Sequence, residues 1–182
     1  MGLALLAGIL IVGFGIWTFN RLTQLRQLAD NAWADIDVQL KRRHDLIPSV
    51  VAVVKGHAGY ERGTLEAVVE ARNRALQAAG PAAKADAEVP VTGSLRRIFA
   101  IAEAYPELRA SENFQRLQAE LSDTEDKIAA ARRYYNTTVR RFNSLIQSVP
   151  TNIIARLAGF REREFFRIED DAERAPVAVS LS

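Results

Sequence analysis

Residues 2–40 read GLALLAGILIVGFGIWTFNRLTQLRQLADNAWADIDVQL, and they combine an apolar stretch with the start of a helical pattern. No charged side chain precedes Arg21, and the first turns carry only apolar residues and glycine until Thr18. An α-helix of about 18 residues is about 27 Å long, close to the roughly 30 Å thickness of a bilayer's hydrocarbon core. Helical periodicity then begins at Leu22 without a linker. The sequence therefore predicts a membrane anchor, residues 2–20, that continues directly into a helical body.

A cleaved signal peptide is the alternative for the apolar stretch. Such a peptide has a basic first region, a short apolar core and a cleavage motif of small residues. Here nothing basic precedes the run, the run is longer, and no Ala-x-Ala motif follows it. Trp17 and Phe19 stand at its C-terminal edge, where aromatic side chains favour the headgroup boundary. We therefore expect the anchor to be retained.

Basic residues follow the anchor on its C-terminal side. Arg21 and Arg26 come first, and Lys41, Arg42 and Arg43 follow as a cluster that we expect to lie on a solvated face. Segments rich in Lys and Arg tend to stay in the cytoplasm. The sequence therefore predicts a single-pass protein of the cell inner membrane, with its N-terminus outside and its body in the cytoplasm.

The composition of the body excludes several classes of function. About 160 residues remain after the anchor, which is enough for one domain with its own core. The formal net charge is +2, and basic and acidic residues are interspersed. A nucleic-acid-binding protein would show clustered positive charge, so no nucleic-acid partner is expected. The chain has no cysteine, which excludes disulfides, thiolate nucleophiles and zinc–cysteine sites.

Helical periodicity runs through most of the body, interrupted by stretches rich in proline and glycine. The expected helices span residues 22–58, 60–77, 95–105 and 111–149, with a short helical segment at 152–158. Residues 78–94 contain Pro81, Pro90 and Gly93, and we expect them to form a loop. Pro48 lies inside the apolar pattern of the first helix, so we expect it to kink that helix without ending it.

The last long helix has an apolar seam that alternates spacings of three and four residues. Its positions are Phe114, Leu117, Leu121, Thr124, Ile128, Ala131, Tyr135, Thr138, Phe142, Leu145 and Val149. This seam is typical of a coiled coil or a left-handed helical bundle. Thr124 and Thr138 need hydrogen-bond partners or small neighbours at such positions.

We therefore predict an all-α fold. In it, the N-terminal transmembrane helix continues into an elongated antiparallel four-helix bundle of up-down-up-down order, because short connections favour antiparallel neighbours. The expected parts are the anchor at 2–20, the bundle at 21–159, and a charged and aromatic C-terminal segment with a tail at 160–182.

Several motifs resemble those of the LemA family. Residues 31–48, NAWADIDVQLKRRHDLIP, are similar to its signature stretch. Further blocks are LEAVVEARN (65–73), YPEL (105–108), ENF (112–114), TEDKIA (124–129), YN (135–136) and PTNIIA (150–155). The resemblance covers residues 20–176 in order. It implies a single-pass membrane protein, common in bacteria, with a four-helix-bundle body and no established enzymatic activity.

His44, Asp45 and Pro48 form a candidate polar cluster at the expected kink. Pro48 cannot donate to a backbone carbonyl one turn earlier, so we expect His44 and Asp45 to make hydrogen bonds there. The functional alternative is a metal or acid–base site. A metal site needs three or four ligands, and the chain has only two histidines, so no metal or other cofactor is expected.

The membrane-proximal half of the two long helices is expected to be under-covered, because the two shorter helices cannot reach it. Exposed apolar surface there would mark an interface. The candidate interface residues are Trp33, Tyr134, Tyr135, Phe142, Phe160, Phe165 and Phe166. The candidate contacts to lipid headgroups are Arg21, Arg156, Arg161 and Arg163. Alternatively, the C-terminal segment folds onto the bare hairpin.

These features favour a noncatalytic membrane-anchored scaffold or adaptor that self-assembles as a homo-oligomer. We expect it to contact membrane lipid and to bind a partner protein, such as a membrane protease or an envelope-stress component. One alternative is a hydrolase-like enzyme whose site the sequence does not show. Another is a protein that organises lipid. No Gly-rich phosphate loop and no arranged nucleophile and base are present in the sequence.

Overall fold

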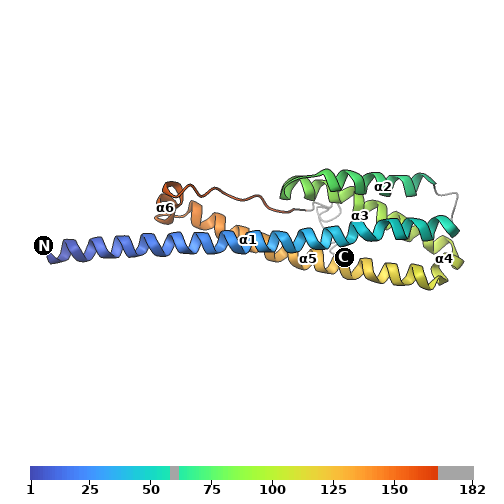
Figure 1. Cartoon of the computed structure of the whole chain (residues 1–182), viewed down its shortest axis with the longest axis horizontal. Helices are drawn as coiled ribbons and strands as arrows, with labels where there is room; N and C mark the ends of the chain where they lie inside the picture. Colours follow the sequence, from blue (N-terminus) through green and yellow to red (C-terminus); the bar gives the residue numbers. More distant parts are fainter. Residues whose placement is uncertain (58–61, 168–182) are drawn as a thin grey trace, which may run out of the picture. The chain divides into compact units, whose positions relative to one another are not determined.

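The computed structural model describes residues 1–57 and 62–167, and the regular structure in these ranges is helical (Figure 1). The helices are α1 (Gly2–His57), α2 (Arg62–Gln77), α3 (Pro81–Ala104), α4 (Pro106–Ala110), α5 (Glu112–Gln147) and α6 (Thr151–Leu157). The predicted all-α fold, with a long apolar N-terminal helix, is therefore confirmed. The predicted boundary at Ala58 to Tyr60 and the predicted tail beyond Arg167 lie outside the described residues.

The chain divides into two compact units. The first unit comprises Met1–Gln39 and Asp126–Phe165, and the second comprises Leu40–Glu125 and Phe166–Ser182. The long helices α1 and α5 each contribute to both units. Each unit has a buried apolar cluster of its own.

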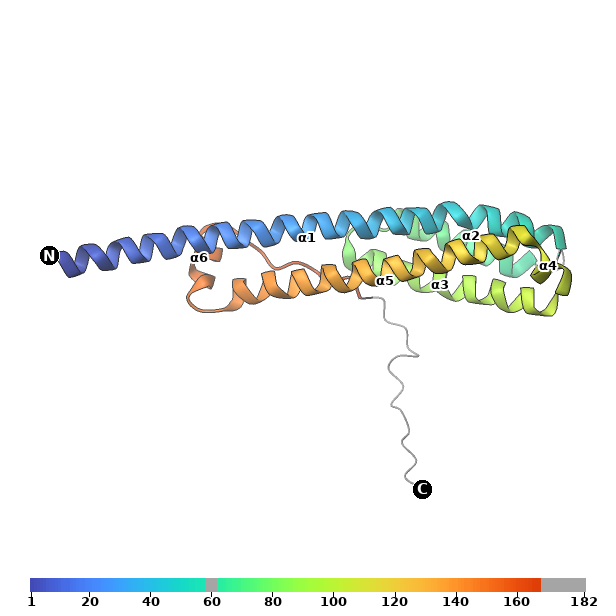
Figure 2. The same ribbon diagram turned by 90° about the horizontal axis from the view of Figure 1, so that it is seen from below.

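In the second unit, helices pack around one apolar core. The chain reverses direction between its successive long helices, as Figures 1 and 2 show for α2, α3 and the adjoining parts of α1 and α5. All of these elements supply core residues that are at most 8% exposed, among them Ile47, Val50, Val54, Val68, Val91, Ile98, Leu108, Phe114 and Leu121. Phe114, Leu117 and Leu121 of the predicted seam in α5 therefore face this core.

In the first unit, the earlier part of α1 packs against the later part of α5. A second buried cluster joins Leu22 and Leu25 of α1 to Phe142 of α5 and Ala155 of α6. After α5 the chain turns, forms α6, and continues as an extended segment, residues 158–165, beside the same two helices (Figure 2). Gly159 ends α6 with a positive φ of 72°, a conformation that glycine adopts without steric cost.

The predicted loop at residues 78–94 is wrong, because α3 begins at Pro81. Proline is favoured in the first turn of a helix, where its missing N–H would have no intrahelical partner. Gly80 precedes it with a φ of 85°, which lets the chain turn into the helix. Alanine, the strongest helix former, dominates the next residues, and Pro90 is accommodated on the exposed side of α3.

Candidate functional site

The second unit contains a buried arginine, Arg43, on α1. It is the largest of the fully buried side chains in the described part of the protein. Arg43 lies three residues after Leu40 and four before Ile47, so it occupies a seam position that faces the core. The prediction of a solvated face is therefore wrong for Arg43, although its neighbours Lys41 and Arg42 are exposed.

Three side chains from two other helices receive the Arg43 guanidinium group. Its Nη2 atom donates to Oε2 of Glu88 on α3, and both side chains are almost completely buried. Its Nη1 atom donates to Oε1 of Glu125 on α5 at 2.5 Å and to Oγ1 of Thr92 on α3 at 3.2 Å. Arg43 thus connects α1, α3 and α5 through charge-assisted hydrogen bonds.

Glu88 also contacts His44. The Nε2 atom of His44 lies 2.9 Å from Oε1 of Glu88, although the alignment falls short of a hydrogen bond. Burial on its own would raise the pKa of the Glu88 carboxyl group, but the contact with His44 and the charge of Arg43 outweigh it and hold the pKa below its ordinary value. Glu88 is therefore a buried carboxylate that stays ionised.

A backbone carbonyl near Pro48 accepts a hydrogen bond from a side chain that the sequence did not indicate. Proline lacks an N–H group, so Pro48 leaves the carbonyl of His44 without its usual donor four residues later. Nε of Arg72, on α2, donates to this carbonyl at 2.8 Å. Helix α1 continues through Pro48, as predicted, and Arg72 supplies the missing hydrogen bond from another helix.

Asp45 does not take part in this arrangement. Its carboxylate accepts a hydrogen bond from Lys41 at 2.6 Å on the exposed side of α1. That hydrogen bond lowers the pKa of Asp45. The expectation that both His44 and Asp45 bond around Pro48 is therefore wrong: the His44 side chain turns to Glu88, and Asp45 pairs in solvent. Within residues 1–57 and 62–167, no group of three or more His, Cys, Asp or Glu side chains could hold a metal ion.

The predicted interface residues are mostly covered by the chain itself. Tyr135, Phe142 and Phe166 are at most 2% exposed, Trp33, Phe160 and Phe165 are partly buried, and Tyr134 is 53% exposed. The expectation of a bare hairpin is therefore wrong for the first unit. The reason is that α6 and residues 158–165 fold onto α1 and α5, which was the alternative placement of this segment.

Aromatic rings hold this covering segment in place. The ring of Phe160 lies 6.1 Å from that of Phe142 and 5.8 Å from that of Phe19, measured between centroids. The guanidinium carbon of Arg26 lies 5.3 Å from the Phe160 centroid, in a cation–π contact. Trp33 and Tyr135 make a similar ring pair at 5.6 Å.

Hydrogen bonds fix the same segment to α5. The Tyr135 hydroxyl donates to the Glu164 carbonyl at 2.9 Å, and burial raises the pKa of Tyr135. The Asn143 side-chain amide donates to the Arg163 carbonyl at 2.9 Å and accepts from the Arg163 N–H at 2.9 Å. The Arg163 side chain pairs with Asp30 of α1. Residues 160–165 are thus an ordered strap over the two long helices.

The four candidate headgroup arginines differ in their surroundings. Arg163 is committed to Asp30. Arg21 donates to the neutral side chain of Gln24 at 2.7 Å. Arg156 and Arg161 are exposed and have no ion pair within the described ranges. The structure therefore leaves positive charge uncompensated at three of the four positions.

Exposed apolar side chains are concentrated in the same unit. Twelve of the large hydrophobic side chains that are exposed lie between Met1 and Phe19. Three more, Val149, Ile153 and Leu157, lie at and beside α6. Helix α1 is the one described helix that is long and apolar enough to cross a membrane.

The chain is all-α and has an exposed apolar N-terminal helix, and the buried charged groups of its body are paired with one another. These features are typical of membrane-associated helical proteins. The LemA family model matches residues 32–181, so the chain belongs to the LemA family. It is 23% identical to magnetosome protein MamQ of Magnetospirillum gryphiswaldense, over 87% of this chain and 68% of that protein. It is 27% identical to protein LemA of Metamycoplasma hominis, over 88% of this chain and 80% of that protein. The resemblance in the motifs is thereby confirmed.

Proposed function

We propose that this protein is a membrane-anchored, noncatalytic helical adaptor that self-assembles and binds partner proteins. One observation carries the membrane-anchored part of the proposal: the uneven distribution of exposed apolar surface. Outside the N-terminal stretch and the region of α6, the large hydrophobic side chains that are exposed in the described ranges are Val38, Val69, Leu76 and Tyr134. A protein that keeps its body polar and one end apolar is suited to a bilayer at that end.

Helix α6 extends this apolar end. A methyl group built on Gly15 would lie 3.8 Å from Cδ1 of Ile154, so α6 packs at the level of the last turns of the apolar stretch. Val149, Ile153 and Leu157 are spaced four residues apart and point outward beside it. We propose that α1 spans the bilayer and that these three side chains enter the interfacial region.

Membrane extraction tests the anchor. The full-length protein should remain in the membrane fraction after washing at high salt and at alkaline pH, because a spanning helix is held by the hydrophobic effect. As a matched comparison, Leu10→Arg places a charge in the middle of the apolar stretch and should reduce membrane retention, since a central arginine costs about 2.5–3.5 kcal/mol. Release of the unaltered protein by either wash would contradict the anchor.

The proposed orientation places the body in the cytoplasm of the inner membrane. Arg21 and Arg26 follow the apolar stretch directly, and Arg140, Arg141 and Arg156 belong to the same unit. This concentration of arginine supports retention on the cytoplasmic side. A reporter fused after Ser182 should be active only as a cytoplasmic tag. Activity of a reporter that works only in the periplasm would reverse the orientation.

Exposed apolar side chains on α2 support self-assembly and partner binding. Val69 and Leu76 of α2 are exposed and lie seven residues apart, on one side of that helix. They supply apolar surface for another chain. Native mass spectrometry of the full-length protein in detergent should show an oligomer, and a chain ending at Gly159 should assemble differently because it lacks the strap. A monomeric full-length protein would contradict self-assembly.

A further inference from the structure

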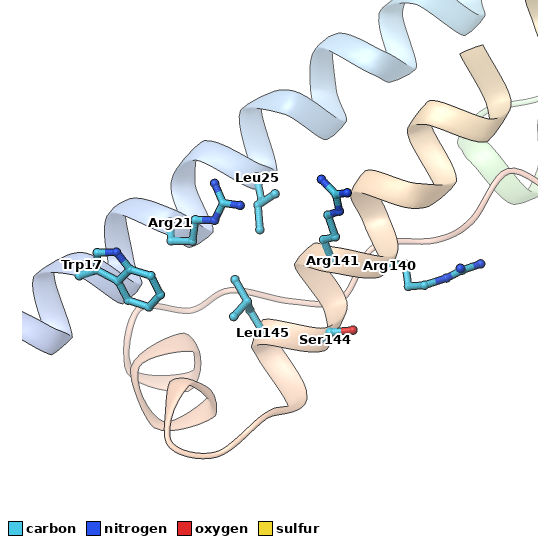
Figure 3. Close-up of a pocket in the computed structure, with 7 residues that line it drawn as sticks. All are labelled: Trp17, Arg21, Leu25, Arg140, Arg141, Ser144 and Leu145. Atoms are coloured by element: carbon cyan, nitrogen blue, oxygen red, sulfur yellow. The ribbon is translucent and has the colours of Figure 1, made fainter. Parts of the chain in front are cut away.

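A pocket of about 370 Å³ opens in the first unit between α1 and α5 (Figure 3). Its apolar wall is formed by Trp17, Leu25 and Leu145. The remaining lining residues are Arg21, Arg140, Arg141 and Ser144. Figure 3 shows Arg141 pointing from α5 toward α1 and Arg21 lying along α1 beside Leu25, while Arg140 leaves the same turn of α5 in another direction. The pocket therefore combines an apolar wall with the guanidinium groups of Arg21 and Arg141.

The pocket lies where the apolar stretch of α1 ends. Trp17, Arg21 and Leu25 are spaced four residues apart and share one face of α1. Helices α1 and α5 run antiparallel in this unit, because Leu22 and Leu25 meet Phe142 whereas Trp33 meets Tyr135. In this register, Trp17 stands at the anchor end and Arg21 lies about 6 Å farther along α1.

The charge in the pocket has no counter-charge on the protein. No carboxylate lines the pocket. Within the described ranges Arg140 and Arg141 make no ion pair, and the hydrogen bond of Arg21 goes to the neutral Gln24. Guanidinium groups next to apolar surface attract phosphate groups, to which they can donate two parallel hydrogen bonds.

We infer that this pocket binds the phosphodiester headgroup of one anionic phospholipid. Arg21 and Arg141 donate to the phosphate, Ser144 supplies a hydroxyl group, and the first part of an acyl chain lies against Trp17 and Leu145. This inference rests on the proposed membrane anchor, which places the pocket at the headgroup level. A free anion would use the arginines alone and would gain nothing from the apolar wall.

Tryptophan fluorescence can report occupancy of this pocket directly. The chain has two tryptophans, so Trp33→Phe leaves Trp17 in the pocket as the only one. The full-length Trp33→Phe protein is reconstituted in phosphatidylcholine vesicles containing a minor fraction of phosphatidylglycerol brominated on its acyl chains. Brominated phosphatidylglycerol should quench Trp17 more than the same fraction of brominated phosphatidylcholine does. The ratio of the two measures selectivity for the anionic headgroup.

Charge-neutral variants separate pocket binding from general attraction to an anionic surface. In the Trp33→Phe background, Arg21→Gln and Arg141→Gln should each reduce the selectivity at least about tenfold, because each removes a charge-assisted hydrogen bond to the phosphate, and such a bond contributes about 1.5–3 kcal/mol. Arg156→Gln is the matched control: it removes one exposed arginine from α6, in the same unit but outside the pocket. It should leave the selectivity unchanged.

The outcomes distinguish this inference from the proposed anchor. Protein that does not float with the vesicles would overturn both the anchor and the lipid site. Protein that floats but shows no selectivity, or loses it equally in Arg156→Gln, would overturn the lipid site alone. Excess inorganic phosphate is tested against chloride at equal ionic strength. If the selectivity is lost in phosphate but kept in chloride, the ligand is a free anion, and the proposed lipid site is overturned.

Discussion

In the second unit one arginine is buried and surrounded by acceptors, whereas in the first unit several arginines stand beside apolar surface without a carboxylate. Arg43 is held by Glu88, Glu125 and Thr92. Arg21 and Arg141 line a pocket in which no acidic residue is found. The surroundings of an arginine, more than its position in the sequence, therefore decide whether it stabilises the fold or remains available to a ligand.

The buried Arg43 contributes more to the specificity of the fold than to its stability. A buried ion pair often contributes little net stability compared with an apolar replacement, because both charges must be removed from water. Its geometry nevertheless fixes which residues of α1, α3 and α5 face one another. Arg21 and Arg141 of the first unit make no such contacts between helices, so their replacement should alter lipid selectivity and leave stability nearly unchanged.

The largest expected effect comes from breaking the buried pair. Arg43→Ala leaves Glu88 buried without its main partner, and we expect the free energy of unfolding to fall by about 3–5 kcal/mol. Thermal and guanidinium unfolding of the full-length protein in detergent, followed by circular dichroism, measures this. Arg42→Ala is the matched control, because Arg42 is exposed and its 3.6 Å contact with Asp123 lies in solvent. The control should change stability by about 0.5 kcal/mol or less.

The double replacement Arg43→Met with Glu88→Leu sharpens the same comparison. It removes both charges and fills the space with apolar groups, so it should cost much less than Arg43→Ala. A cost equal to that of the single variant would mean that the charges themselves, and not the unpaired carboxylate, determine the loss.

The apolar seam of α5 provides the next largest effect and compares the two units directly. Leu121 belongs to the second unit and Ile128 to the first, and each is at most 2% exposed. Leu121→Ala and Ile128→Ala should each reduce the free energy of unfolding by about 2–5 kcal/mol. Fluorescence of Trp33 and circular dichroism should be recorded together. Coincident transitions in both variants would show that the units unfold as one, and separate transitions would show that they do not.

Much of the fold could be predicted from periodicity. The spacing of three and four residues identified most buried positions of α5, and Thr124 and Thr138 do find acceptors. Each donates to the carbonyl four residues earlier, at 2.7 Å and 3.0 Å. The prediction is wrong for Val149, the last seam residue, which lies beyond the end of α5 and is 79% exposed. The start of α3 could not be predicted in this way, because Pro81 and Pro90 are also typical of loops, although proline is common in the first turn of a helix and tolerated on an exposed face.

The site was harder to predict, although part of it was visible. Arg43 occupies a seam position between Leu40 and Ile47, and this spacing alone could have indicated burial. Its partner Glu88 could not be assigned, because it lies in α3, which was expected to be a loop. The position of the strap over Phe142 could not be predicted, because a segment of mixed charged and aromatic residues is equally suited to a membrane surface and to a pair of helices.

The acidity of Glu88 predicts how the second unit responds to pH. The pKa of this carboxyl group is lower in the folded protein than its usual value of 4.5. In this range the unfolded chain binds more protons than the folded one, so stability is complete above that value and is lost as the pH falls below it. Glu88→Gln should be less stable at neutral pH and should lose less stability on acidification. Parallel pH profiles of the two proteins would assign the acid sensitivity to other carboxylates.

The smallest expected effect concerns the backbone carbonyl that Pro48 leaves free. Arg72 donates to the His44 carbonyl at 2.8 Å, and Arg72→Met should cost about 1 kcal/mol because the carbonyl loses this donor. Pro48→Ala restores an N–H group that can bond the same carbonyl within α1, with helix content unchanged. In that background Arg72→Met should therefore cost clearly less than in the unaltered protein. Chemical unfolding of the four proteins gives the coupling energy between the two positions. Equal costs in both backgrounds would mean that Arg72 stabilises the unit through contacts other than the His44 carbonyl, and that α1 tolerates Pro48 without help from α2.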